Sequence, residues 1–149
     1  EFTITELIKR VNILMKHELK NAYIYMNVVM KTDENQVIKG NVNSLVQVVN
    51  NMISNAIQAY DGKHDKNIEL TVNKKENNIV ISITDFAGGL PQEVKDRLFK
   101  EMVTTKGKNG TGLGLYMSYS NIKAHFGGDI TYVTETGKGT TFNIIIPLR

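Results

Sequence analysis

Residues 106–115 read Lys-Gly-Lys-Asn-Gly-Thr-Gly-Leu-Gly-Leu, and the last three glycines alternate with Thr111 and Leu113. Alternating glycines let the backbone bend freely and let a ligand approach it closely. An apolar run with helical spacing follows from Leu115 to Phe126, so we expect the glycines to open a helix. Free N–H groups and the positive end of the helix dipole favour phosphate at such a junction. The alternative is a tight turn without a ligand.

Two well-known phosphate-binding loops do not match this stretch. The Rossmann fingerprint G-x-G-x-x-G fails because Gly114 comes one place early. Gly107 and Gly112 have the Walker A spacing, but Leu113 and Gly114 stand where that loop requires Lys and Ser or Thr. A phosphate site here would therefore be of a third kind.

The composition narrows the class of protein. A chain of 149 residues is long enough for one domain with a proper core. The net charge of +3 is compatible with a polyphosphate ligand and too small to indicate nucleic acid. The chain has no cysteine, which excludes disulfides and thiolate metal sites. We expect a cytoplasmic domain without membrane contact. Since the chain begins at Glu1 without an initiator Met, we also expect residues 1–149 to be a fragment of a longer protein.

The pattern of apolar residues predicts the order of helices and strands. Thr3 and Glu6 fit a capping box, and helical spacing continues as far as about Asn21. A strand is expected over Tyr23–Val29. The later predicted elements are a short strand at 37–38, a helix from Asn43 or Ser44 to Ile57, a hairpin of 68–73 and 79–84, a short helix from Pro91 to Leu98, the helix ending at Phe126, and a hairpin of 129–134 and 140–146. We expect an α+β fold in which helices layer on one face of a mixed sheet.

Neutral amides line one side of the predicted helix at 43–57. Asn51 and Asn55 lie one turn apart, opposite the apolar stripe. Asn is a poor helix former, so two of them in mid-helix indicate a functional role. The alternative is a solvated face.

A second candidate site follows the predicted strand at 79–84. Asp85 is followed by Phe86 and Ala87 and then by Gly88 and Gly89, which is typical of a ligand-facing turn. The alternative is a plain turn in which Asp85 acts as a local cap. Residues 99–109 contain lysines and lack apolar periodicity, which predicts a mobile lid.

Four signals thus stand in one order, namely the amide pair, the Asp85 turn, Phe99 and the glycines of 110–115. Together they resemble the N, G1, F and G2 boxes of the ATP-binding domain of sensor histidine kinases, over nearly the whole chain. This superfamily also includes gyrase, mismatch-repair and heat-shock chaperone ATPases and anti-sigma serine kinases. The resemblance implies a Bergerat α/β sandwich, a mixed sheet covered on one face by three helices, with ATP and Mg²⁺ as cofactors.

The resemblance also implies roles for individual residues. The amide oxygen of Asn55 would bind Mg²⁺, which prefers oxygen ligands, and Asn51 would face the same phosphates. Asp85 would accept a hydrogen bond from the adenine amino group, and Gly89 would let the backbone pass close to the base. Thr140 or Thr141 would support that acid. Phe99 belongs to the nucleotide site as the F box.

The glycine stretch would wrap the phosphates. The implied phosphate-binding residues are Gly110, Thr111, Gly112, Leu113, Gly114 and Leu115. Lys106 would reach the terminal phosphate, although a solvated loop lysine is the equal alternative. Asn51 and Lys106 are thus the candidate catalytic residues. The sequence departs from the family at Ala87, where glycine is usual, and at Gln58, where Lys or Arg often stands.

Asn51 separates the enzyme classes of the superfamily. Hydrolytic ATPases and serine kinases usually carry Glu at that position as a general base, and Asn cannot take a proton. We therefore expect a histidine kinase domain whose partners are its own upstream dimerisation domain and, through it, a response regulator. An ATP-driven clamp and a nucleotide-sensing module are the alternatives.

His17 begins a sequence that resembles the phosphoacceptor box, His17-Glu18-Leu19-Lys20-Asn21, but Ala22 stands where proline is usual. Only thirty-three positions separate His17 from Asn50, too few for a dimerisation hairpin plus the first strands. We expect His17 to be a residue near a helix end and the true acceptor to lie upstream.

Overall fold

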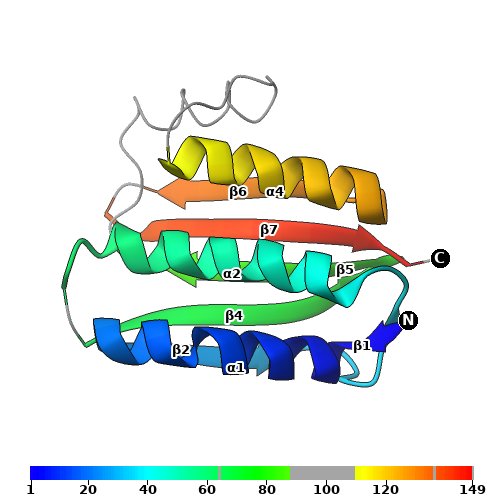
Figure 1. Ribbon diagram of the computed structural model, residues 1–149, viewed down its shortest axis with the longest axis horizontal. Helices are drawn as coiled ribbons and strands as arrows, with labels where there is room; N and C mark the ends of the chain where they lie inside the picture. Colours follow the sequence, from blue (N-terminus) through cyan, green and yellow to red (C-terminus); the bar gives the residue numbers. More distant parts are fainter. Residues whose placement is uncertain (64, 88–109, 136, 149) are drawn as a thin grey trace.

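A sheet and a layer of helices make up the described chain, as Figure 1 shows. The computed structural model describes residues 1–63, 65–87, 110–135 and 137–148, and for 110–115 it describes only the backbone. The elements are β1 (Phe2–Thr3), α1 (Ile4–Ala22), β2 (Ile24–Met30), β3 (Val37–Ile38), α2 (Val42–Ala59), β4 (Lys66–Lys75), β5 (Asn78–Asp85), α4 (Gly110–Phe126), β6 (Asp129–Glu135) and β7 (Gly139–Pro147).

The main sheet has the strand order β2-β4-β5-β7-β6. β2 pairs with β4 in parallel and the other neighbours pair antiparallel, so the sheet is mixed, as predicted. Buried and partly exposed residues alternate along β5 and β7. The apolar face packs against α1, α2 and α4, which all lie on the same side of the sheet (Figure 1). The other face carries polar side chains such as Ser82 and Asn143, which are joined by a hydrogen bond of 2.7 Å.

The first helix follows its sequence signals closely. The Thr3 side chain accepts from the Glu6 N–H at 3.2 Å, which confirms the capping interaction at the start of α1. Its buried residues recur at helical spacing and are Ile4, Leu7, Val11, Met15 and Leu19. His17 is exposed on the side away from this stripe.

The structure differs from the sequence expectations in three places. The cap of α2 is Asn41, whose side chain accepts from the N–H groups of Asn43 and Ser44, so neither Asn43 nor Ser44 caps the helix. β3 pairs with β1, a two-residue strand that the sequence pattern does not predict because it is too short for visible alternation. α4 begins at Gly110, so the glycines lie in its first turns and not in a loop ahead of it.

The predicted short helix from Pro91 to Leu98 and the predicted lid at 99–109 lie outside the described residues. Among the described helices, none is long and apolar enough to cross a membrane.

Candidate functional site

Asp85, the last residue of β5, is the one buried acid among the residues that the structure describes. It is 5% exposed and lies opposite Thr140 of β7. Its Oδ1 accepts from the Ala87 N–H at 3.0 Å. Burial raises the pKa of Asp85 above its ordinary value, while backbone N–H groups of Ala87 and Thr140 oppose this shift by stabilising the charge. The end of β5 thus places the buried Asp85 carboxylate, a hydrogen-bond acceptor, on the sheet face that the helices cover.

Thr140 and Thr141 point to opposite faces of the sheet. Thr140 is buried on the same face as Asp85, and its hydroxyl pairs with that of Thr134 at 2.9 Å. Thr141 pairs with Thr84 at 2.8 Å on the face without helices. Of the two predicted candidates, Thr140 is therefore the one beside the carboxylate.

A buried tyrosine ties the end of α2 to the Asp85 turn. Tyr60 is 2% exposed and is the C-cap of α2. Its hydroxyl donates to the carbonyl oxygen of Asn67 and accepts from the Phe86 N–H at 2.8 Å. Burial raises the pKa of Tyr60, the Phe86 N–H lowers it, and the nearby Asp85 charge raises it further. The phenol therefore stays protonated and serves as a fixed link.

The strand start at Gly139 approaches Asp85 very closely. A Cβ atom built on Gly139 would lie 2.0 Å from the carbonyl oxygen of Asp85. Only glycine fits without moving the backbone that carries the acid. Gly128, at the other end of the sheet, has a similar contact of 2.0 Å with the carbonyl oxygen of Ile145.

The amide pair of Asn51 and Asn55 lies on one side of α2, and Asn51 reaches α4. The Asn51 side-chain N–H donates to the hydroxyl of Ser118 at 3.2 Å, and Ser118 is 2% exposed. Asn51 thus joins α2 to α4. Asn55, one turn further on, is partly buried, and its side chain makes no hydrogen bond with any residue that the structure describes.

Asn50 marks the opposite side of the same helix. It shares a helical face with Asn43, which bonds Arg10 at 2.8 Å, and with Ser54, which donates to Glu18 at 3.2 Å. That face is turned to α1. The side-chain oxygen of Asn50 is buried and unpaired within the described residues. The two sides of α2 therefore face different helices, α1 on one side and α4 on the other.

Two cavities border this region. One of about 330 Å³ lies between α2 and α4 and is lined by Gln47, Asn51 and Ser118 among others. Another of about 150 Å³ lies beside Asp85, Gly139 and Thr141. Asp85 and Asn51 thus each border open space.

The amide oxygen available on α2 is a suitable ligand for Mg²⁺. The amide oxygen of Asn55 is a hard ligand left without an internal partner among described residues. Among the described residues, no group of three or more His, Cys, Asp or Glu could hold a metal ion. A cation here would rest on one protein oxygen and on ligands from a bound molecule or water, which is how Mg²⁺ is commonly held beside phosphates.

The glycine stretch supplies the first N–H groups of α4. Residues 110–115 are helical, and the first four N–H groups of a helix have no intrahelical acceptor. This is the donor array that an anion requires. Gly89, Phe99 and Lys106 lie outside the described residues.

Sequence reasoning missed Tyr60 and Ser118 as parts of the site. The hydrogen-bond partners of Tyr60, the Asn67 carbonyl and the Phe86 N–H, come from other parts of the chain, and Ser118 looks like any helical serine, so neither gives a local signal.

Known proteins resemble the chain in sequence. Sporulation kinase C of Bacillus subtilis (strain 168) is 33% identical over 148 residues, which are 98% of this chain and 33% of that protein. Sensor histidine kinase ZraS of Escherichia coli (strain K12) is 36% identical over 112 residues, which are 75% of this chain and 23% of that protein. The chain therefore spans a third or less of these relatives.

Solved structures share the fold. The catalytic domain of histidine kinase ThkA, in a nucleotide-free form, superposes with a TM-score of 0.80 at 23% identity and covers 99% of this chain and 94% of that one. A second form gives a TM-score of 0.79 at 26% identity, with 99% and 93% covered. The α/β sandwich predicted from the sequence is thereby confirmed.

A family model matches residues 40–149, well over half of the chain. That range holds both the amides of α2 and Asp85. The chain belongs to the family of histidine kinase-, DNA gyrase B- and HSP90-like ATPases and is homologous to sensor histidine kinases.

Proposed function

We propose that this chain binds Mg-ATP and donates the γ-phosphoryl group to a histidine on a separate dimerisation domain, as part of a two-component sensor kinase. Residues 1–149 would be the catalytic domain of a longer chain. The observation that carries the proposal is the buried carboxylate of Asp85, which ends β5 on the sheet face that α2 and α4 cover.

At the adenine end, Asp85 accepts a hydrogen bond from the exocyclic amino group. Guanine presents a carbonyl oxygen at that position, so the carboxylate selects adenine. The Ala87 and Thr140 N–H groups hold the carboxylate in place and favour its ionised form. Gly139 keeps the neighbouring strand close enough for this arrangement. Gly89 gives the base a close approach to the backbone.

At the phosphate end, the Asn55 oxygen holds Mg²⁺, whose charge offsets that of the phosphates. The N–H groups of residues 110–115 and the Lys106 ammonium hold phosphate oxygens. Asn51 cannot act as a base, and this domain needs none, because the neutral imidazole of the acceptor histidine is already nucleophilic. A ring nitrogen of the acceptor histidine bonds to the γ-phosphorus as the bond from that phosphorus to the β,γ-bridging oxygen breaks, and ADP leaves.

The partners follow from this reaction. The acceptor histidine is on the parent's own dimerisation domain, which passes the phosphoryl group to a response regulator. Histidine kinase ThkA, to which this chain is similar in fold, has been solved in complex with response regulator protein TrrA. That complex supports such an arrangement.

Titration calorimetry tests the binding step. ATP and ADP with Mg²⁺ should bind, GTP should bind far more weakly, and removal of Mg²⁺ by a chelator should weaken ATP binding. Equal affinity for GTP and ATP would exclude the adenine role of Asp85.

The isolated chain should bind ATP and yet gain no acid-labile phosphate. The reason is that His17 sits on α1 and is not on a dimerisation hairpin. Incubation with labelled ATP and the parent's dimerisation domain should label that domain in trans. Label on the chain that disappears in His17→Gln would contradict this assignment. Rapid release of free phosphate without the partner would favour the clamp ATPase, and binding without either reaction would favour the sensing module.

Gly139→Ala should destabilise the chain by about 1–3 kcal/mol, because the added methyl group overlaps the Asp85 carbonyl. Gly128→Ala is the matched control, since it meets a carbonyl oxygen at the same 2.0 Å distance. Urea denaturation should show similar losses for both variants. At a temperature where both are folded, only Gly139→Ala should lower ATP affinity. Equal binding by the two variants would remove the Gly139 contact from the nucleotide site.

A further inference from the structure

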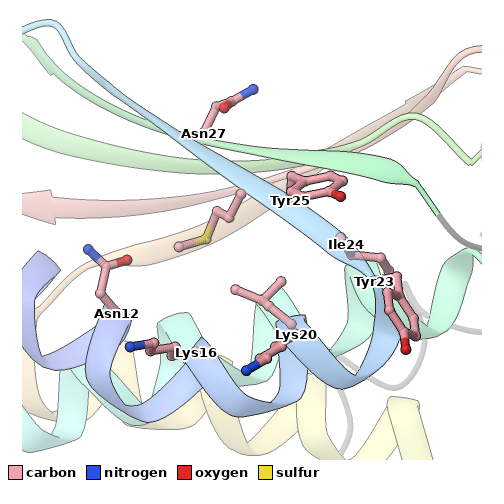
Figure 2. Close-up of a pocket in the computed structure, with 9 residues that line it drawn as sticks. Asn12, Lys16, Lys20, Tyr23, Ile24, Tyr25 and Asn27 are labelled. Atoms are coloured by element: carbon pink, nitrogen blue, oxygen red, sulfur yellow. The ribbon is translucent and has the colours of Figure 1, made fainter.

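The edge of the sheet at β2 forms a groove with α1, shown in Figure 2. The cavity has a volume of about 590 Å³. Asn12, Lys16, Leu19 and Lys20 of α1 line one side, and residues 23–27 line the other. The groove is distant in sequence from Asp85 and the amides of α2, and it has no part in the function proposed above.

The backbone of β2 presents hydrogen-bonding groups at this edge. The carbonyl oxygen of Tyr23 accepts from the Asp65 N–H at 2.9 Å, and the Lys31 N–H donates to the Val72 carbonyl at 2.8 Å. Odd-numbered residues therefore bond toward β4. Because alternate residues of a strand bond to opposite sides, Ile24, Met26 and Val28 direct their N–H and C=O groups to the open edge.

This edge lacks the usual protection against pairing. Natural edge strands carry charges, prolines or bulges that keep other chains away. β2 reads Ile-Tyr-Met-Asn-Val-Val-Met and has neither a charge nor a proline. β6, at the other edge, begins at Asp129 and ends at Glu135. Tyr25 is 58% exposed on β2, a suitable cross-strand neighbour for an apolar side chain.

The charge of the groove indicates which kind of chain fits. Lys16 and Lys20 lie one turn apart on the flank of α1 beside β2 (Figure 2). Neither lysine forms an ion pair within the described residues. Four helical residues advance about 6 Å, and two strand residues advance about 6.8 Å. Acidic side chains at alternate positions of an added strand would therefore match the two lysines.

We propose that β2 and α1 bind an extended acidic segment of a partner protein, which adds as a further strand to the sheet. Its backbone pairs with the outward groups of β2, and its alternate carboxylates face Lys16 and Lys20. A second copy of this chain fits less well, because its own two lysines would bring like charge into the groove.

Fluorescence anisotropy tests this with the full 149-residue chain and a labelled eight-residue peptide that alternates glutamate with valine. The peptide should bind at low salt, and a peptide that alternates lysine with valine should not. Lys16→Glu with Lys20→Glu should weaken binding about tenfold or more. Lys74→Glu with Lys75→Glu, at the far end of β4, makes the same change in net charge and should leave binding intact.

Two N-methylated peptides test the strand pairing directly. Methylation of alternate nitrogens blocks either the edge that faces β2 or the edge that faces solvent. One peptide should lose binding and the other should keep it. Equal loss by both, binding that survives in Lys16→Glu with Lys20→Glu, or tight binding of the lysine peptide would overturn the proposal. Dimerisation of the chain that blocks the labelled peptide would assign the edge to a second copy instead.

Discussion

Asp85→Asn is expected to weaken ATP binding by about ten- to a hundredfold. A hydrogen bond to a charged group contributes about 1.5–3 kcal/mol, and each 1.4 kcal/mol corresponds to about tenfold in affinity. Titration calorimetry with ATP and Mg²⁺ measures the loss. Asp129→Asn is the control, because Asp129 is the first residue of β6 and its carboxylate also accepts from a nearby N–H. Unchanged affinity in Asp85→Asn would remove Asp85 from the site.

The raised pKa of Asp85 also predicts opposite effects of pH on binding and stability. In the proposed site the ionised carboxylate of Asp85 accepts from the adenine amino group, so ATP affinity should fall as pH falls through this raised pKa. The folded chain holds the Asp85 proton more tightly than the unfolded chain does. This difference stabilises the folded chain fully at pH values below the pKa of Asp85 in the unfolded chain. The stabilisation is lost as pH rises through the higher pKa of Asp85 in the folded chain. Urea denaturation across this window should show that loss in the wild type and not in Asp85→Asn.

Asn55→Ala is expected to reduce Mg²⁺-dependent ATP affinity and phosphoryl transfer by about ten- to a hundredfold. Groups that merely support a metal ligand already have effects of about that size, so loss of the ligand itself should have no smaller one. Folding should suffer less, because the Asn55 amide has no partner among the described residues. Calorimetry with and without Mg²⁺, together with labelled transfer to the dimerisation domain, measures the effect.

Asn50→Ala is the control for that variant. Asn50 has the same side chain on the same helix, but it lies on the face turned to α1. The Asn50→Ala variant should bind Mg-ATP as tightly as the wild type does. If Asn55→Ala unfolds with no separate nucleotide defect, the amide pair is structural and this part of the proposal is wrong.

Much of the fold could be predicted from local pattern alone. The apolar stripes of α1 and α2 place both helices to within about two residues, and alternation locates β4, β5 and β7. The predicted mixed sheet with helices on one face is confirmed. The cap of α2 could not be chosen with certainty, because Asn41, Asn43 and Ser44 are all good caps and packing decides among them.

The sequence names residues for the candidate site, but it does not show the contacts that these residues make. The motif order points to Asp85 and Asn55, and the strand register then brings Thr140 next to the acid. No sequence pattern shows that Asn51 bonds Ser118, which lies 67 residues away. The start of α4 was missed because glycine has low helix propensity, and a helix that begins with glycines reads as a loop. The roles of all these site residues stay predictions, and Gly89, Phe99 and Lys106 also lie outside the described residues.

The hydroxyl of Tyr60 has a consequence for how the domain opens. It holds the Phe86 N–H and the Asn67 carbonyl from the end of a helix, inside the core. We therefore expect the Phe86 amide proton to exchange with solvent when the hydroxyl of Tyr60, at the end of α2, separates from the Phe86 N–H. Local opening of the turn that follows Asp85 is thereby coupled to opening at the end of α2. A nucleotide bound at Asp85 would slow amide exchange in the turn and at the end of α2 together.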